Sequence, residues 1–147
     1  MSHSIDVLIY GASGYTGKLV AESLVERGIP FYFAGRNRER LENALAVVEE
    51  RCDKPVNAEI VEVSAVASDL VPVFEKVKVV INVAGPFMQM AWPVVESCLE
   101  AKCHYLDTTG EQDWVLAISE KYGDSFKQAG LLLCPANAFM WAAGSLA

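Results

Sequence analysis

Residues 5–21 read IDVLIYGASGYTGKLVA, and this stretch decides the fold of the chain. An apolar strand runs into three glycines spaced three residues apart, and the next residues have the apolar spacing of an amphipathic helix. A strand, a glycine-rich turn and a helix in this order are typical of the turn that cradles the pyrophosphate of a dinucleotide. The alternative is an ordinary glycine-containing turn.

Each glycine of this turn has a separate physical role. Gly11 allows the tight exit from the strand, because glycine adopts backbone angles that other residues avoid. Gly14 removes a side chain where backbone N–H groups approach phosphate, and Gly17 lets the helix pack close to the sheet. The helix N-terminus adds free N–H groups and the positive end of the helix dipole.

Length and composition predict one globular domain, since the chain has 147 residues of which 52% are hydrophobic. The formal net charge is −7. An acidic surface repels nucleic acid and anionic membranes, so we expect neither as a partner. The N-terminal residues run directly into the first strand, which leaves no room for a signal peptide. These features predict a cytoplasmic protein.

The four cysteines are Cys52, Cys98, Cys103 and Cys134, and they form no C-x-x-C pair. They lie in apolar or mixed segments. We therefore expect buried reduced thiols rather than disulfides or a metal site. Reduced thiols agree with a reducing cytoplasm.

Strand-like and helix-like segments alternate along the chain without repeats or linkers. This alternation predicts an α/β fold, a doubly wound parallel sheet with helices on both faces. Two βαβαβ halves imply the Rossmann strand order 3-2-1-4-5-6, with the ligand at the switch point between the first and fourth strands. The expected strands are residues 5–10, 31–34, 59–63, 79–84, 104–106 and 131–134.

The helices between these strands follow from caps and apolar spacing. Asn37 is placed to cap the helix after the second strand. Residues 66–77 form a weaker helix, which we expect to be irregular because Pro72 lies inside it. Residues 112–122 form a helix that turns Val115 and Ile118 inward.

The end of the second strand, residues 34–37, reads Ala-Gly-Arg-Asn and indicates NADP. NAD-preferring sites place Asp or Glu there to accept from the ribose 2′-OH, and this chain has neither. Arg36 is instead placed for a 2′-phosphate, with Ser13 and Asn37 as neighbours. Such a charge-assisted bond contributes about 1.5–3 kcal/mol, enough to favour NADP over NAD by roughly 10- to 150-fold. The alternative is a solvated loop arginine.

The end of the fourth strand and the loop after it, residues 82–87, read Asn-Val-Ala-Gly-Pro-Phe and lie at the switch point. We expect Ala84 and Gly85 to approach the pyrophosphate and ribose, because this architecture binds its ligand there. Phe87 is expected to wall the nicotinamide side. A plain turn at Gly85-Pro86 is the alternative.

Residues 107–111 read Asp-Thr-Thr-Gly-Glu and end the fifth strand near the expected reaction face. Their hydroxyls and carboxylates are suited to orient a nicotinamide or a substrate. Equally, Thr109 with Gln112 could only cap the next helix. The catalytic residues are unknown, because the Tyr-x-x-x-Lys pair of short-chain dehydrogenases is absent. His104 lies at the start of its strand, away from the switch point, so we expect it to be a surface or core residue and not a catalytic one.

Four motifs in order make the chain similar to a known family. Residues 10–17, 34–37, 79–87 and 105–111 together resemble the N-terminal NADP-binding domain of the saccharopine dehydrogenase-like family, including its trans-acting enoyl reductase members. The resemblance implies an NADP-dependent oxidoreductase with a Rossmann domain followed by a substrate and dimerisation domain. From the resemblance and the motifs above, the expected cofactor-binding residues are Gly11, Ala12, Ser13, Gly14, Tyr15, Thr16, Gly17, Arg36, Asn37, Ala84, Gly85, Pro86 and Phe87.

The chain departs from this family after the sixth strand. Relatives continue with a Gly-Phe-Asp stretch and a nearby Pro-Ser-Asp, whereas residues 136–142 read Ala-Asn-Ala-Phe-Met-Trp-Ala. We therefore assign residues 1–135 to the dinucleotide-binding Rossmann domain, and residues 136–147 to the start of a missing second domain or to an interface tail. The uncharged tail predicts a homodimer through itself or through the edge of the sixth strand.

Two functions remain open from the sequence. One is an NADP-dependent reductase that transfers hydride to or from a substrate held by a domain absent from this chain. The other is a non-catalytic NADP(H)-sensing module, because no acid/base pair can be identified. A self-sufficient short-chain reductase is disfavoured by the missing Tyr-x-x-x-Lys pair. In either case we expect this chain alone to be inactive.

Overall fold

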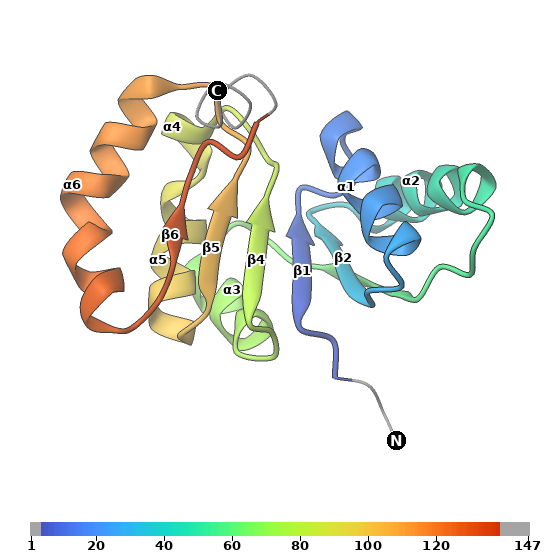
Figure 1. Ribbon diagram of the computed structural model, residues 1–147, viewed down its shortest axis with the longest axis horizontal. Coiled ribbons are helices and arrows are strands. Elements are labelled where there is room, and N and C mark those ends of the chain that lie inside the picture. The colour runs from blue at the N-terminus through green and yellow to red at the C-terminus, as the bar shows by residue number, and fades with distance from the viewer. Residues whose placement is uncertain (1–3, 139–147) are drawn as a thin grey trace.

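The computed structural model describes residues 4–138, which form a parallel six-stranded sheet with helices on both faces (Figure 1). The strand order is β3-β2-β1-β4-β5-β6, and every neighbouring pair is parallel. The doubly wound topology predicted from the alternating segments is confirmed. The strands are β1 (Val7–Tyr10), β2 (Phe31–Gly35), β3 (Ala58–Glu62), β4 (Val79–Asn82), β5 (His104–Asp107) and β6 (Leu133–Cys134).

The helices divide between the two faces according to the direction in which the chain winds. Helices α1 (Tyr15–Glu26) and α2 (Arg38–Arg51) pack on the face that belongs to the first half of the sheet. The opposite face is covered by α3 (Ala67–Phe74), α4 (Phe87–Met90), α5 (Trp92–Ala101) and α6 (Gln112–Gln128). Right-handed crossovers produce this division when the chain first moves outward from β1 on one side and then on the other.

Alternation along the strands builds a separate core on each face. In β1, Leu8 and Tyr10 pack with the α3–α6 helices, whereas Ile9 packs with α1 and α2, because successive side chains point to opposite faces. Helix α1 presents Gly17 and Ala21 to the sheet, and both are buried. Their small size lets the helix lie close to β1, which places its N-terminus at the strand's carboxyl end.

Helix α6 buries one of the two residues predicted to face inward. Ile118 is fully buried as predicted, whereas Val115 is only half-buried and Trp114, which was not predicted, is fully buried beside it. The indole of Trp114 packs edge-to-face on Trp92, with ring centroids 4.8 Å apart. The larger aromatic side chain takes the inward position because it buries more apolar area and finds a buried acceptor for its N–H.

The ends of several elements also differ from the predicted ones. Helix α3 ends at Phe74 instead of residue 77, and Pro72 lies inside it without breaking it. Leu70 and Phe74 are both 0% exposed, and they anchor this short helix in the core. Strand β4 ends at Asn82, so the loop at the switch point begins two residues earlier than expected.

All four cysteines are free thiols. Cys98 and Cys103 are buried, but Cys52 and Cys134 are half-buried, in contrast to the prediction that all are buried. Among residues 4–138, no cluster of His, Cys, Asp or Glu is suited to hold a metal ion. No helix within this described range is long and apolar enough to cross a membrane.

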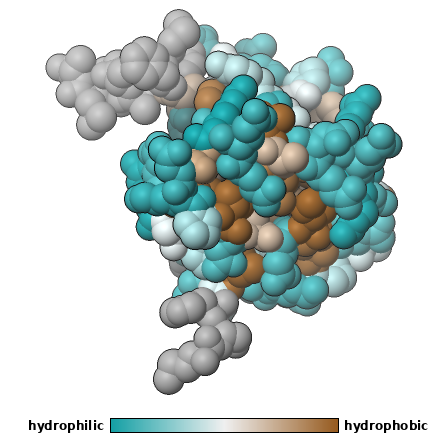
Figure 2. Space-filling model, turned by 90° about the vertical axis from the view of Figure 1, so that its right-hand side faces the viewer, coloured by the Kyte–Doolittle hydropathy of each residue, from teal (hydrophilic) through white to brown (hydrophobic). Residues whose placement is uncertain are grey.

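The outer surfaces of the two halves differ. Figure 2 shows the side that lies at the right of Figure 1, where α2 is, and hydrophilic residues dominate it with hydrophobic ones in separate patches. At the other end, β6 is a two-residue edge strand that pairs with β5 alone. In Figure 1 no described helix lies in front of β4, β5 and β6, so one face of this half of the sheet is left open by residues 4–138.

Candidate functional site

A cleft of about 350 Å³ lies at the carboxyl ends of β1, β2 and β4, across the switch point of the sheet. This volume lies within the range of small-molecule sites. Of the predicted cofactor-binding residues, those that line the cleft are Gly11, Ser13, Gly14, Arg36, Asn37, Ala84 and Gly85. Those that do not line it are Ala12, Tyr15, Thr16, Gly17, Pro86 and Phe87. Arg40, to which the sequence did not point, and Met90 also line the cleft.

The glycines of the first turn have the three geometries that the turn requires. Gly11 has a φ of +80°, in the left-handed region. A Cβ on Gly17 would lie 2.3 Å from the carbonyl oxygen of Ala12, so this position has no room for a side chain. A Cβ on Gly14 would meet only the Gly11 carbonyl oxygen, at 3.6 Å. The protein therefore leaves open space above Gly14, on the side of the cleft.

Some backbone amides of the turn are hydrogen-bonded within the fold, whereas others have no partner among the described residues. The N–H groups of Gly11 and Ala12 both donate to the carbonyl of Ala34 at 3.0 Å, so they stabilise the fold. Helix α1 begins at Tyr15, and its first-turn amides have no acceptor inside the helix. These amides and the helix dipole favour an anion at this point. Tyr15 and Thr16 thus offer backbone groups, and the Tyr15 side chain is 75% exposed.

Two arginines line the cleft at the end of β2. Arg36 follows the strand directly, and Arg40 lies in the first turns of α2. Asn37 caps α2 as predicted, because its Oδ1 accepts from the Arg40 N–H at 2.9 Å. Burial raises the pKa of the Tyr10 hydroxyl, and the nearby positive charge of Arg36 partly offsets this effect. None of the ion pairs found within residues 4–138 involves Arg36 or Arg40.

The loop after β4 forms the opposite wall of the cleft. Its Ala84 N–H donates to the Oδ1 of buried Asn82 at 3.1 Å, which fixes the first turn of the loop. Gly85 lines the cleft, and the Gly85–Pro86 peptide bond is cis. The Phe87 ring lies beneath this loop in the α3–α6 core and is 8% exposed. Met90, rather than Phe87, presents a side chain to the cleft.

Asp107 is a fully buried carboxylate held by four hydrogen bonds. Its Oδ2 accepts from the Tyr105 hydroxyl and the Trp114 indole, each at 2.8 Å. Its Oδ1 accepts from the backbone N–H of Thr109 at 3.1 Å and of Ala136 at 2.9 Å. Burial raises the pKa of Tyr105, and the adjacent Asp107 charge raises it further. This network stabilises the ends of β5 and β6 and presents no proton acceptor to the cleft.

Two further polar residues after β5, Thr109 and Glu111, also have partners within the fold. The Thr109 hydroxyl accepts from the Glu111 N–H at 2.9 Å just before α6, but no side chain caps this helix, so the capping alternative with Thr109 and Gln112 was wrong. The Glu111 carboxylate accepts from the N–H groups of Phe87 and Met88. The Thr109 hydroxyl and the carboxylates of Asp107 and Glu111, which were expected to face a nicotinamide or a substrate, are thus engaged within the fold.

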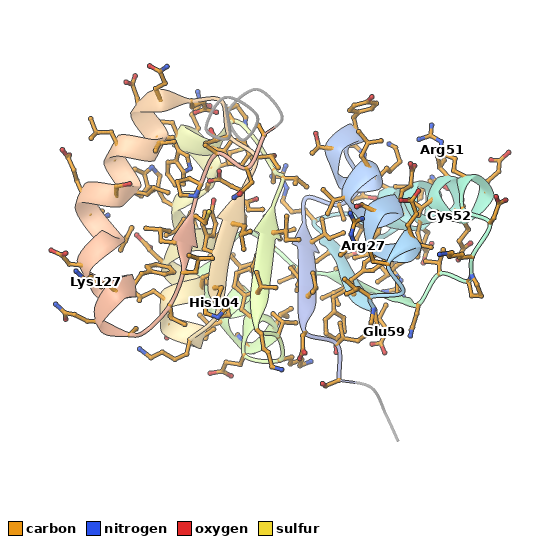
Figure 3. The ribbon with its side chains drawn as sticks, in the orientation of Figure 1. Arg27, Arg51, Cys52, Glu59, His104 and Lys127 are labelled. Atoms are coloured by element: carbon orange, nitrogen blue, oxygen red, sulfur yellow. The ribbon has the colours of Figure 1, made fainter. Side chains whose placement is uncertain are left out.

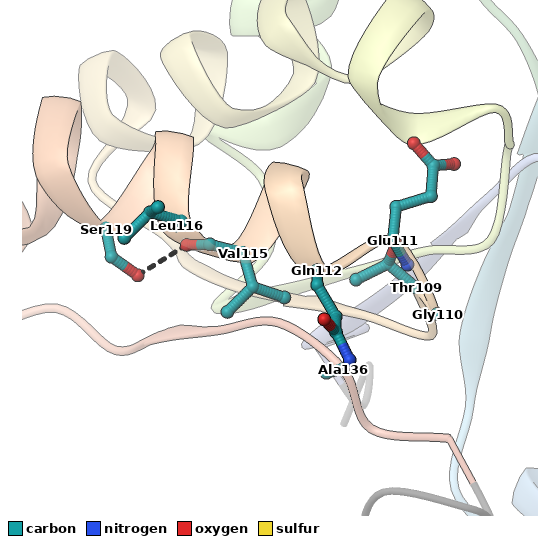
Figure 4. Close-up of a pocket in the computed structure, with 8 residues that line it drawn as sticks. All are labelled: Thr109, Gly110, Glu111, Gln112, Val115, Leu116, Ser119 and Ala136. Atoms are coloured by element: carbon teal, nitrogen blue, oxygen red, sulfur yellow. Dashed lines mark hydrogen bonds between the residues drawn. The ribbon is translucent and has the colours of Figure 1, made fainter.

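A second pocket, of about 330 Å³, lies between the first turns of α6 and the segment after β6 (Figure 4). Val115, Leu116 and Ala136 give it apolar walls. The Ser119 hydroxyl at its end donates to the carbonyl of Val115 at 2.7 Å. This apolar pocket lies next to the loop after β5.

His104 lies at the amino end of β5, at the end of the sheet opposite to the cleft (Figure 3). Its Nδ1 accepts from the Leu132 N–H at 3.0 Å, which links β5 to the segment before β6. This histidine has a structural partner and is remote from the site.

The model of the family described as the saccharopine dehydrogenase NADP binding domain matches residues 7–132. A lipid droplet localized protein from Caenorhabditis elegans is 34% identical over 137 residues, which cover 89% of this chain and 32% of that protein. A trans-acting enoyl reductase from Mycobacterium leprae is 35% identical over 109 residues, 72% of this chain and 25% of the relative. The chain thus spans about a third or less of the length of these relatives.

Among solved structures, the apo saccharopine dehydrogenase (L-Glu forming) from Saccharomyces cerevisiae has a TM-score of 0.68 with 18% sequence identity. The match covers 90% of this chain and 27% of that one. At this identity the likeness concerns the fold alone.

Proposed function

The chain belongs to the family of saccharopine dehydrogenase NADP-binding domains, and we propose that it serves an oxidoreductase that transfers hydride between NADP(H) and a substrate held mainly outside residues 4–138. The domain binds NADP, as its family does. The single observation that carries the residue assignment is the cleft at the switch point. It combines open space above Gly14 with two arginines free of ion pairs among the described residues.

The donors of this cleft fit the charges of NADP. Open space above Gly14 and the first amides of α1 suit the pyrophosphate. Arg36 and Arg40 suit the 2′-phosphate, since guanidinium groups pair well with phosphate oxygens. Ala84 and Gly85 suit the half of the dinucleotide that lies beyond the switch point. We propose these groups as the binding residues.

The residues of this chain bind and orient, and the bound cofactor would supply or accept the hydride. The ionisable side chains that line the cleft are Tyr10, Arg36 and Arg40. Burial raises the pKa of Tyr10, so at neutral pH its hydroxyl stays protonated and is no base. We propose that the proton required by a carbonyl, imine or enoyl substrate is handled by residues outside 4–138. No feature of the described residues favours the sensing module that the sequence left open.

Calorimetric titration of the 147-residue chain with NADPH and NADH tests the cofactor preference. We expect tighter binding of NADPH, because NADH lacks the phosphate that the two arginines would contact. Equal affinities would contradict the role given to Arg36. A parallel assay of NADPH oxidation with carbonyl, imine and enoyl substrates should show no turnover by this chain. Turnover in step with substrate reduction would place the catalytic residues within it.

A homodimer remains part of the proposal. The two-residue edge strand β6 and the open face over β4–β6 are surfaces that a partner could cover. The tail residues Phe139, Met140, Trp141 and Leu146, which suggested an interface, lie outside the described residues. Light scattering on the full chain and on a version ending at Ala138 tests this idea. Two equally soluble monomers would refute it.

A cytoplasmic location is likewise proposed, on the basis of the four free thiols, which agree with a reducing compartment. The name of the Caenorhabditis elegans relative places that protein at lipid droplets. Cell fractionation with an antibody against this chain would separate the two locations. Recovery in the droplet fraction would overturn the proposal.

A further inference from the structure

The carboxylate of Glu111 reaches from the loop after β5 to the segment that follows β4. Its Oε1 accepts from the Phe87 N–H at 2.8 Å, and its Oε2 accepts from the Met88 N–H at 2.9 Å. These are the first two amides of α4, which have no acceptor inside their own helix. Figure 4 shows the Glu111 side chain pointing toward the neighbouring helix and away from the other pocket residues.

The two amides lie in the middle of a segment that forms one wall of the cofactor cleft. Gly85 precedes them and Met90 follows them, and both line the cleft. The Phe87 ring supports Gly85 from below, since a Cβ on Gly85 would lie 3.4 Å from the Phe87 Cε2. A shift of Phe87 or Met88 would therefore move the cleft wall.

Glu111 is itself held by its neighbours in sequence. Its N–H donates to the Thr109 hydroxyl at 2.9 Å, and the Thr109 N–H donates to the buried Asp107 carboxylate at 3.1 Å. Alternate residues of the Asp-Thr-Thr-Gly-Glu segment thus form a chain of contacts from the sheet to α4. Because both bonds to α4 have a charged acceptor, they are stronger than bonds between neutral groups.

We propose that Glu111 is a positioning residue for the nicotinamide half of bound NADP(H). It fixes the wall from Gly85 to Met90 without contacting the cofactor. This inference rests on the proposed assignment of the cleft to NADP(H). In a Rossmann domain the first βαβαβ half holds the adenosine end and the second half holds the nicotinamide end. Loss of Glu111 should therefore affect one end of the dinucleotide and leave the end at Arg36 unchanged.

The test compares two ligands by calorimetry on the 147-residue chain. NADPH spans both halves of the site, whereas adenosine 2′,5′-bisphosphate contains the adenine and the 2′-phosphate but no nicotinamide. For Glu111→Ala we expect NADPH binding to weaken roughly tenfold, the equivalent of one net hydrogen bond. Binding of adenosine 2′,5′-bisphosphate should change less than about twofold. Glu111→Gln keeps one acceptor oxygen. Its NADPH affinity should therefore lie between that of the unmodified chain and that of Glu111→Ala.

Glu120→Gln is the matched control, because Glu120 is an exposed glutamate of α6, the helix that begins directly after Glu111. It should bind both ligands as the unmodified chain does. Unchanged NADPH affinity in Glu111→Ala would overturn the proposal. So would an equal loss for both ligands with a lower unfolding temperature, because that result would make Glu111 a helix cap that only stabilises the fold. If the unmodified chain bound neither ligand, the cofactor assignment itself would fail, and this inference with it.

Discussion

A Cβ atom on Gly11 would lie 2.6 Å from the Cβ of Ala84, closer than two carbon atoms can approach without a bond. Gly11 directly follows β1 and Ala84 follows β4, so the two loops at the switch point of the sheet approach each other here. The floor of the cleft depends on a glycine at position 11 for a steric reason as well as a conformational one.

Gly11→Ala is therefore expected to lower the free energy of unfolding by about 2–4 kcal/mol, because it adds a backbone collision to a strained φ. Gly28→Ala is the control, since Gly28 has a φ of +67° and nothing within 4 Å of its Cβ position. It should cost about 1 kcal/mol, from strain alone. Urea denaturation measures both, and equal losses would contradict a collision with Ala84.

Gly14→Val should separate binding from folding. The valine side chain would extend into the open space of the cleft, where the phosphates are expected, and the Cβ itself is in ordinary contact with the fold. We expect unchanged urea denaturation and NADPH binding weakened by at least about 100-fold. Retention of tight binding by the folded variant would show that the phosphates bind elsewhere.

Arg36→Ala should lower the ratio of NADPH affinity to NADH affinity by roughly 10-fold or more, which removes most of the preference. The affinity for NADH should change little, because NADH has no 2′-phosphate to lose. Arg27→Ala is a suitable control, since Arg27 bonds to Ser23 at the far end of α1 (Figure 3). Calorimetry with both nucleotides measures the preference, and a preference that survives in Arg36→Ala would transfer the role to Arg40.

Stability should fall at alkaline pH through Tyr105. Burial raises the pKa of this hydroxyl in the folded state, whereas in the unfolded chain it is about 10. The contribution of Tyr105 to the free energy of unfolding is thus complete below pH 10. It is lost as the pH rises above 10, at about 1.4 kcal/mol per pH unit. Tyr105→Phe should reduce this slope, and a residual slope should remain from Tyr10, Tyr122 and Cys98, because burial raises their pKa values too. Urea denaturation between pH 8 and pH 11 measures the slope, and Tyr15→Phe at an exposed ring is the control.

The sheet order was predictable because its evidence is local. The glycine turn at residues 11–17 marks the first βα unit, and the alternation of apolar segments implies parallel crossovers. The faces of the helices were less predictable. Trp114 displaces Val115 from the core of α6 because Asp107 and Trp92 offer its ring a partner, and neither contact can be read from helical spacing.

The candidate site was predictable where the backbone itself forms it, as at Gly14 and Gly85. Arg40 could have been found, because the Asn37 cap places the first turns of α2 beside the end of β2. The role of Glu111 could not, since its acceptor oxygens bind amides that lie 24 and 23 residues earlier in the chain. Phe87 follows the loop that lines the cleft, yet its ring is apolar enough to be taken into the core.

The buried Asp107 also determines how the polypeptide leaves the sheet. Its carboxylate accepts from the Ala136 N–H, and its backbone carbonyl accepts from the Asn137 N–H at 2.8 Å. Two consecutive amides beyond the last strand are therefore hydrogen-bonded to Asp107 at the end of β5. A force applied at Ala136 or Asn137 would be transmitted directly to β5 through these two bonds, and to the edge strand β6 through the Asn137 side chain, whose amide donates to the Cys134 carbonyl at 2.7 Å.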